Sequence, residues 1–225
     1  MEEQKSLQSS SECFKHLSAD ELELLLDKKK RITYLQGENV MKQGAFATHV
    51  IYVIEGLVRV YLQTTTQKQI NLRLMKQGEF MAFSAVFGEE EYPYSAIALT
   101  DTTVCMVDKM ALQQLLIKNP QFGLQITSRN YNSEQRYLEI ISNISYKQMR
   151  GKLASTLIYL SGFEESGEEV YKYMTRQDIA DFASITNESA IKFLKEFEKD
   201  GVIQLDGRHI RILKKDSLTL ISKNS

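Results

Sequence analysis

Hydrophobic residues in the first half of the chain recur in short runs that glycine-bearing turns separate. Runs of this kind, at nearly even spacing and without helical segments between them, predict an antiparallel sandwich or barrel rather than a parallel sheet. Ahead of them, Ser18 and Glu21 have the spacing of a capping box, which predicts a short helix over about residues 19–28. The predicted strands are 32–35, 40–41, 50–54, 57–62, 70–75, 95–99 and 103–107.

The hydrophobic period changes to that of helices after residue 108. Residues 110–117 predict a short helix, and a long one follows from Pro120 to about residue 144. A heptad pattern in the long helix predicts pairing with a second copy of the chain, whereas packing on the chain's own core is the alternative. The positions of this pattern are Ile126, Asn130, Ser133, Tyr137, Ile140 and Ile144, of which Ile126, Tyr137, Ile140 and Ile144 are the expected dimer contacts.

The last third of the chain begins with a helix over residues 147–161. Thr175 and Asp178 then form a second capping box, which predicts a short amphipathic helix up to residue 183. After the turn 184–186, a longer helix covers residues 187–199. Its expected buried residues are Ala190, Ile191, Leu194 and Phe197.

A hairpin follows these helices. The pair Asp206 and Gly207 predicts a type I′ turn between strands over residues 202–205 and 209–213. Two helices across a tight turn, followed by a hairpin, predict a winged helix-turn-helix. The fold class is therefore α+β, with an antiparallel β domain, a long dimerisation helix and a winged helix-turn-helix.

The second helix of a helix-turn-helix enters the major groove and presents a polar face to the bases. On this face, Asn187, Glu188 and Lys192 are candidates for base reading, because amide and carboxylate groups match adenine and cytosine edges. Thr175, Gln177, Thr186 and Ser189 are candidate phosphate contacts, and Arg208 lies on the wing. A charged face that is merely solvated is the alternative for the helix alone.

The composition of the chain argues against several other classes of function. The net charge is -1, so DNA affinity must come from local clusters of Lys and Arg. Two cysteines are too few for a four-thiolate cluster, and the three histidines are scattered, so we expect no metal, no catalytic residue and no enzyme. No signal peptide and no apolar run of about 20 residues is present, which predicts a cytoplasmic protein without a membrane partner.

Several segments resemble one known family. TRQDIA at 175–180, TNES at 186–189 and LKEFEKDGVI at 194–203 resemble the DNA-binding module of the Crp/Fnr transcription regulators. Upstream, GE at 37–38, YVIEG at 52–56 and GEF at 78–80 resemble the β-roll of cyclic nucleotide-binding domains. The resemblance implies a β-roll sensor domain over 1–118, a dimerisation helix over 119–146 and a DNA-binding domain over 147–225.

The chain departs from the family where cyclic AMP binds. The family's Gly-Glu and Arg-Ser pairs, which hold the ribose and the phosphate, are replaced by Ala82-Phe83 and Tyr94-Ser95. Without that carboxylate and guanidinium, we expect no cyclic AMP binding and assign no cofactor. The candidate pocket for another effector consists of Phe83, Tyr94, Ser95 and Tyr137.

A second departure concerns the recognition helix, where Asn187 stands at a position that is often Arg in the family. The resemblance implies a homodimer that binds a pseudo-palindromic double-stranded DNA operator, with RNA polymerase as a further partner. The alternative hypothesis is a small-molecule-binding module whose DNA binding is weak or absent.

Overall fold

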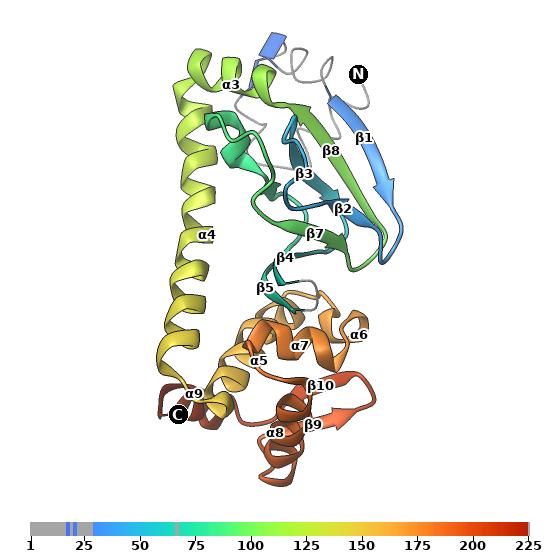
Figure 1. The fold of residues 1–225 in the computed structure, drawn as a ribbon, viewed down its shortest axis with the longest axis vertical. Helices are drawn as coiled ribbons and strands as arrows, with labels where there is room; N and C mark the ends of the chain where they lie inside the picture. The colour runs from blue at the N-terminus through green and yellow to red at the C-terminus, as the bar shows by residue number, and fades with distance from the viewer. Residues whose placement is uncertain (1–16, 19, 22–28, 66–67, 225) are drawn as a thin grey trace. The chain divides into compact units, whose positions relative to one another are not determined.

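The computed structural model describes residues 17–18, 20–21, 29–65 and 68–224, without the side chains of residues 29 and 129–134 (Figure 1). The chain forms two compact units, Met1–Gln63 with Arg73–Gln135, and Thr64–Leu72 with Arg136–Ser225. Most of the helix predicted over 19–28 lies outside the described residues. Its capping box is present, because Ser18 N donates to Glu21 Oε2 over 2.9 Å and Glu21 N donates to Ser18 Oγ over 3.3 Å.

Antiparallel strands make up most of the first unit. They form two four-stranded sheets with the orders β1-β8-β3-β6 and β2-β7-β4-β5. All strands predicted from the short hydrophobic runs are present, and β6 was not predicted. The bounds are β1 Lys29–Tyr34, β2 Asn39–Met41, β3 His49–Glu55, β4 Val58–Thr65, β5 Lys68–Met75, β6 Phe80–Met81, β7 Ser95–Ala98 and β8 Thr102–Asp108.

One glycine sets how closely the turns of this unit pack. Gly56, between β3 and β4, has φ +94°, and a Cβ at this position would lie 2.6 Å from the main-chain oxygen of Asp101. Any larger residue would push the β7–β8 turn away, so the glycine predicted only as a turn signal is also a packing requirement. The core beneath includes Tyr52, Leu115 and Ile126, which are all fully buried.

Two helices follow β8. Helix α3 (Lys109–Lys118) begins where the Asp108 side chain accepts from the amides of Met110 and Ala111. Helix α4 (Pro120–Tyr146) is 27 residues long. A 3₁₀ helix, η2 (Phe83–Phe87), was not predicted from the sequence.

The faces of α4 differ from the predicted heptad face. Ile126 is fully buried and Ile140 is 8% exposed within the chain itself, so these two residues are not available to a partner. Leu124, Leu138 and Ile141 are instead 72%, 60% and 60% exposed. Of the other two predicted contacts, Tyr137 is half-buried and Ile144 is 40% exposed, so the four differ in exposure, because a heptad pattern alone does not say which side faces the chain's own core.

Helices dominate the second unit. The bounds are α5 Met149–Glu165, α6 Val170–Tyr173, α7 Arg176–Ala183, α8 Asn187–Lys199, β9 Ile203–Asp206, β10 His209–Ile212 and α9 Lys215–Asn224. The predicted helix-turn-helix corresponds to α7 and α8, and the hairpin to β9 and β10. Helices α6 and α9 were not predicted.

Two details of this unit correct the predictions. Ile191 is 37% exposed rather than buried, because it lies at the edge of the apolar face of α8. Asp206 pairs with His209 in the hairpin, so Gly207 and Arg208 occupy the centre of the turn. Gly207 has φ +56°, while Arg208 is not among the described residues with positive φ. A positive φ at the first central residue alone is the requirement of a type II′ turn, so the predicted type I′ turn was wrong.

Candidate DNA-binding interface

The start of α7 is fixed by its capping box. Thr175 Oγ1 accepts from Asp178 N over 3.1 Å, and Asp178 Oδ2 accepts from Thr175 N over 2.8 Å. The Thr175 hydroxyl also donates to Asp178 Oδ2 over 2.7 Å. Its single hydrogen is therefore engaged within the cap, and Thr175 acts on the helix end rather than as a free hydroxyl donor.

Gln177 lies exposed in the first turn of α7. Its Nε2 donates to Asp181 Oδ1 over 2.7 Å, one turn further along the helix. This contact fixes the side chain of a residue that the sequence singled out as a phosphate contact.

Helix α8 has a matching start. Thr186 Oγ1 accepts from Ser189 N over 3.2 Å and donates to Ser189 Oγ over 3.1 Å. The two hydroxyls predicted as phosphate contacts are thus held together at the N-terminus of the recognition helix. Glu188 is exposed next to them, and its pKa is lowered by hydrogen bonds to its own amide and to Thr186.

The amide of Asn187 is not fully satisfied. Its Oδ1 is buried and accepts no hydrogen bond within the part of the chain that the structure describes. Lys192 is well exposed, with its Nζ 4.0 Å from Glu196 Oε1. Asn187, Glu188 and Lys192 all lie in the first two turns of α8, next to the partly exposed Ile191.

The two helices are held together from the inside. Ile179 and Phe182 of α7 and Ala190, Leu194 and Phe197 of α8 are all buried. Between the helices Ser184 adopts a left-handed conformation with φ 52°, which turns the chain sharply. The polar face of α8 points outward as a consequence.

Arg176 joins this pair of helices to the wing. Its Nη2 donates to the main-chain oxygen of Gly207 over 2.7 Å, and its Nη1 to that of Arg208 over 3.4 Å. No role was predicted for Arg176 from its place in the sequence. Its partners are carbonyl groups 31 and 32 residues away, which no local pattern reveals.

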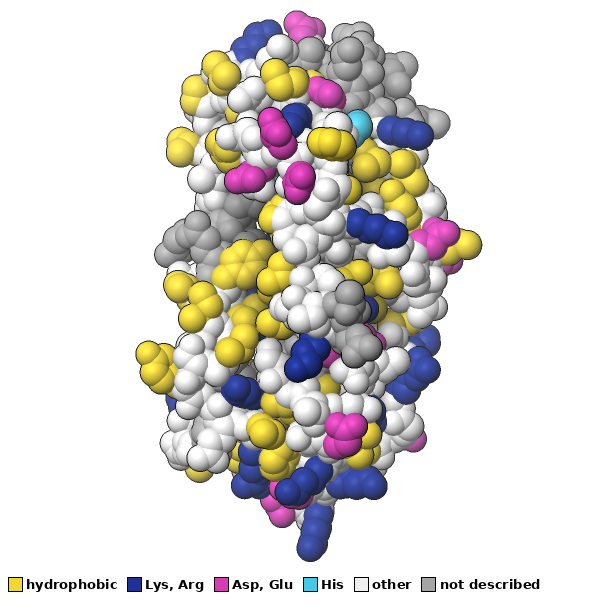
Figure 2. All heavy atoms as spheres, viewed as in Figure 1, with side chains coloured by type: hydrophobic (Ala, Val, Ile, Leu, Met, Phe, Trp, Pro, Cys, Tyr) yellow, Lys and Arg dark blue, Asp and Glu magenta, His cyan; other side chains and the backbone are white. Residues whose placement is uncertain are grey.

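Cations gather around this end of the unit. Figure 2 shows Lys and Arg side chains over the elements that Figure 1 labels α8, β9 and β10. The exposed cations are Lys192, Lys195, Lys199, Arg208 and Arg211. Exposed acids lie among them, at Glu188, Glu198, Asp200 and Asp206, so any phosphate contacts must come from individual cations and not from a uniformly positive surface.

Two family models match the chain in the order that this architecture requires. A cyclic nucleotide-binding domain matches residues 31–119, and a Crp-like helix-turn-helix domain matches residues 151–221. The chain belongs to the Crp/Fnr family of transcription regulators. The family assignment supports the regulator over the alternative of a ligand-binding module.

Curated members of the Crp/Fnr family match along most of the chain. The fumarate and nitrate reduction regulatory protein of Vibrio cholerae is 27% identical over 198 residues, which cover 86% of this chain and 78% of that protein. The anaerobic regulatory protein of Bacillus subtilis is 29% identical over 200 residues, which cover 84% of this chain and 82% of that protein.

Solved structures of Crp/Fnr regulators share the fold. FixK2 from Bradyrhizobium japonicum has a TM-score of 0.74 at 18% identity and covers 88% of this chain and 98% of its own. The c-di-GMP responsive regulator CLP of Xanthomonas campestris has a TM-score of 0.75 at 20% identity, and the match covers 87% of this chain and 99% of the CLP chain. Among the described residues, no helix is both long and apolar enough to cross a bilayer.

The residues proposed for an effector pocket have structural partners in the Crp/Fnr β-roll. Tyr94 Oη accepts from Ala82 N over 2.9 Å, and Ala82 is in a left-handed conformation with φ 57°. Ser95 Oγ accepts from Gln43 N over 3.0 Å. Both hydroxyls therefore hold main chain in place.

The two remaining pocket candidates lie in different units. The Phe83 ring packs between those of Phe80 and Phe87, at centroid distances of 6.4 and 5.7 Å. Tyr137 is half-buried on α4 and belongs to the second compact unit, whereas Phe83 belongs to the first.

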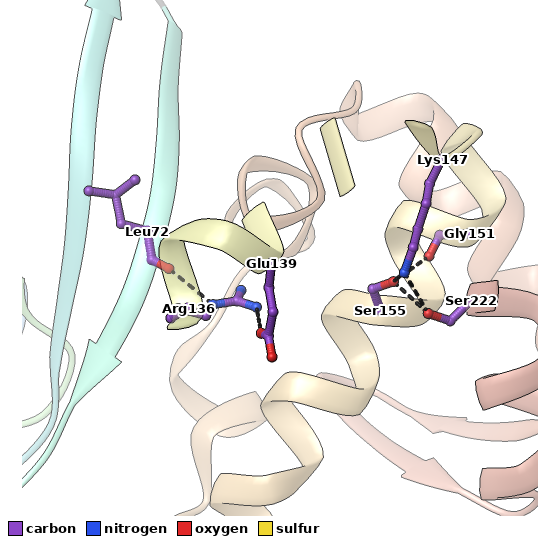
Figure 3. A network of polar contacts seen from close by, with 7 residues as sticks. All are labelled: Leu72, Arg136, Glu139, Lys147, Gly151, Ser155 and Ser222. Atoms are coloured by element: carbon purple, nitrogen blue, oxygen red, sulfur yellow. Dashed lines mark hydrogen bonds and ion pairs between the residues drawn. The ribbon is translucent and has the colours of Figure 1, made fainter. Parts of the chain in front are cut away.

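The junction between α4 and α5 is tied to the C-terminal helix (Figure 3). Lys147 Nζ donates to Ser155 Oγ over 2.7 Å and to Ser222 Oγ over 2.9 Å, and burial lowers its pKa. Ser155 donates its one hydrogen to the Gly151 oxygen, so Ser222 is the donor in the 2.7 Å contact between the two hydroxyls. Helix α9 is thereby an integral part of the DNA-binding unit.

Proposed function

We propose that this Crp/Fnr regulator binds a pseudo-palindromic operator as a homodimer and reads each half-site with α8. The observation that carries the proposal is the outward polar face of α8, which lies beside a wing that Arg176 holds. A twofold dimer would place two such helices about 34–36 Å apart, one helical turn of DNA. On a promoter, such a dimer acts on RNA polymerase within the cytoplasm, either by contact or by exclusion.

Asn187 is the residue expected to change the operator. Its buried Oδ1 has no partner among the described groups, and an unpaired buried acceptor is energetically unfavourable. Rotation of this amide toward an adenine would satisfy both its oxygen and its nitrogen. Arg at the same position would favour guanine, because Arg to guanine is the commonest specific contact.

Selection from random duplex DNA tests this assignment. The unmodified protein should enrich a two-half-site sequence, and Asn187→Arg should shift the preference toward guanine at one position of each half-site. Lys195→Ala is the control, because a phosphate contact weakens binding evenly and leaves the enriched sequence unchanged. If Asn187→Arg and the unmodified protein enrich the same half-site, the recognition helix is assigned wrongly.

The exposed apolar residues of α4 support the dimer. Leu124, Leu138 and Ile141 present large apolar side chains to solvent in the single chain, and Ile144, a predicted contact three residues after Ile141, is 40% exposed. Their spacing of 14 and three residues keeps them on one side of a helix. We infer that this side, rather than the one carrying Ile126 and Ile140, pairs with a second chain.

No effector is assigned. The cyclic AMP cassette lacks its carboxylate and guanidinium, and the hydroxyls of Tyr94 and Ser95 at that place hold main chain. We infer that cyclic AMP does not regulate this protein.

A further inference from the structure

Part of β5 packs on α7 through side-chain amides. Residues 64–72 belong to the same compact unit as the helix-turn-helix, although in sequence they lie within the cyclic nucleotide-binding match. Asn71 Nδ2 donates to the main-chain oxygen of Asp178 over 2.9 Å, and Gln69 Nε2 donates to Asp181 Oδ2 over 2.7 Å. Asn71 is fully buried and Asp181 is 8% exposed, so these contacts are largely shielded from water.

Asp181 connects this segment to the predicted DNA contact. Its Oδ2 accepts from Gln69, and its Oδ1 accepts from Gln177 Nε2, both over 2.7 Å. A carboxylate only accepts, so the direction of both hydrogen bonds is fixed. An amide group carries two N–H bonds, and the bond from Gln177 to Asp181 uses one of them.

The β5 segment is itself held in place. Arg136 Nε donates to the main-chain oxygen of Leu72 over 3.3 Å (Figure 3), and its guanidinium lies 3.6 Å from the centre of the Tyr159 ring. That ring packs against Phe182 of α7 at 5.9 Å between centroids. The backbone of β5 next to Gln69 is therefore linked to α7 through Arg136 of α4 and Tyr159 of α5.

We propose that Gln69 and Asp181 are positioning residues of the DNA interface. Gln69 orients the Asp181 carboxylate, which orients the Gln177 amide so that its second N–H donates to a DNA phosphate. Fixing a flexible side chain before binding removes part of the entropic penalty of binding. The inference rests on the proposed DNA binding and adds a residue from β5 to it.

A double-mutant cycle separates this role from a general loss of stability. Binding is measured by fluorescence anisotropy on the duplex that the unmodified protein enriches, well below the unfolding temperature and with the active fraction titrated. Gln69→Leu and Gln177→Ala should each weaken binding about 3- to 10-fold, the range expected when one side chain loses its order. The double variant should bind no more weakly than the weaker single variant, because Gln69 acts through Gln177.

Gln36→Leu is the matched control. Gln36 is exposed in the turn after β1, and its main-chain amide donates to Asp101 Oδ1, so the Gln36→Leu variant should bind DNA with the affinity of the unmodified protein. A second readout needs no DNA. In the free protein, Gln69→Leu should shift the side-chain NH₂ resonances of Gln177 in a proton–nitrogen NMR spectrum, with Gln177→Ala used for assignment.

The outcomes separate the two proposals. If the unmodified protein binds its duplex with a steep salt dependence, but the losses of the two variants multiply or Gln69→Leu has no effect, the positioning role is wrong and the DNA-binding function stands. Unchanged Gln177 resonances in Gln69→Leu overturn the positioning role as well. If no duplex is enriched, the proposed function fails, and this inference fails with it.

Discussion

Arg176 donates to the main-chain oxygen of Gly207 over 2.7 Å and so connects the first helix of the helix-turn-helix to the turn of the wing. The wing hairpin has only two strands of four residues each, and a hairpin of this size is marginally stable by itself. The position of Arg208 at its tip consequently depends on Arg176.

Arg176→Lys should weaken DNA binding without changing the enriched sequence. Lysine keeps the charge but lacks the planar fork that reaches two carbonyl groups at once. We expect about a 10-fold higher Kd, equivalent to about 1.4 kcal/mol, measured by anisotropy. Arg211→Lys is the control for the loss of an exposed guanidinium on the same hairpin, and an equal loss in that variant would contradict the role of Arg176.

Glu188→Ala should relax specificity at one base pair and weaken binding by about 1–3 kcal/mol, the usual size of one base contact. The Glu188 carboxylate is exposed at the start of α8, where hydrogen bonds with its own amide and with Thr186 lower its pKa. Selection and anisotropy measure the two effects. Glu89→Ala, at an exposed acid of the β-roll, controls for the change in net charge. Base reading by Glu188 would be contradicted if Glu89→Ala also relaxed the enriched sequence, or if Glu188→Ala left it unchanged.

Leu138→Asp should convert the dimer into a monomer. A charge in the exposed apolar face of α4 would be buried on pairing, which is strongly unfavourable without a partner. Size-exclusion chromatography with light scattering measures the mass. Leu220→Asp is the matched control, because Leu220 on α9 is 61% exposed against 60% for Leu138. A monomeric unmodified protein at micromolar concentration would refute the proposed dimer.

Cyclic AMP at millimolar concentration should leave the melting temperature unchanged. A ligand present at 100 times its Kd stabilises a protein by about 2.7 kcal/mol, which corresponds to a rise of roughly 5–10 °C for a chain of this size. Such a shift is easily seen by differential scanning fluorimetry. A rise that grows with the concentration of cyclic AMP would show that other residues, such as Arg59 or Arg73, bind the phosphate.

Glu79→Gln should change how stability depends on pH. Burial raises the pKa of the Glu79 carboxyl above its ordinary value of 4.5, although its Oε2 accepts from Lys76 N. A raised pKa in the folded state gives stability that is complete below pH 4.5 and is lost as the pH rises through the folded value. The free energy of unfolding of the unmodified protein should therefore fall relative to that of Glu79→Gln as the pH rises from 4.5 through the folded-state pKa. Urea unfolding at several pH values measures the difference, and the opposite trend would disprove it.

Local signals in the sequence predicted local structure well. The capping box of Thr175 and Asp178 and the bounds of α8 are confirmed, since caps and helical periodicity depend on residues three or four positions apart. The β-strands were predicted from short hydrophobic runs between glycine-bearing turns, with the exception of β6, which was not predicted. Helix α9, which follows the hairpin, was not predicted.

Features that depend on distant residues could not be found in this way. The exposed side of α4 depends on what the rest of the chain covers, so the heptad reading chose Ile126 and Ile140, which face inward. The bonds from Gln69 and Asn71 to α7 span 112 and 107 residues, and neither amide has a recognisable motif. The additional hydrogen bond that the Thr175 hydroxyl donates to Asp178 Oδ2 was likewise visible only in three dimensions.

The buried amide of Asn71 also bears on how the chain can be divided. Helix α7 has only eight residues, and helices of this length do not persist in water without contacts from elsewhere. A fragment that starts at Arg136 would contain the whole helix-turn-helix, but it would lack the strand that covers the Asp178 carbonyl and the Asp181 carboxylate. The DNA-binding unit is thus discontinuous along the chain, and residues 64–72 are synthesised more than sixty residues before the helices that they complete.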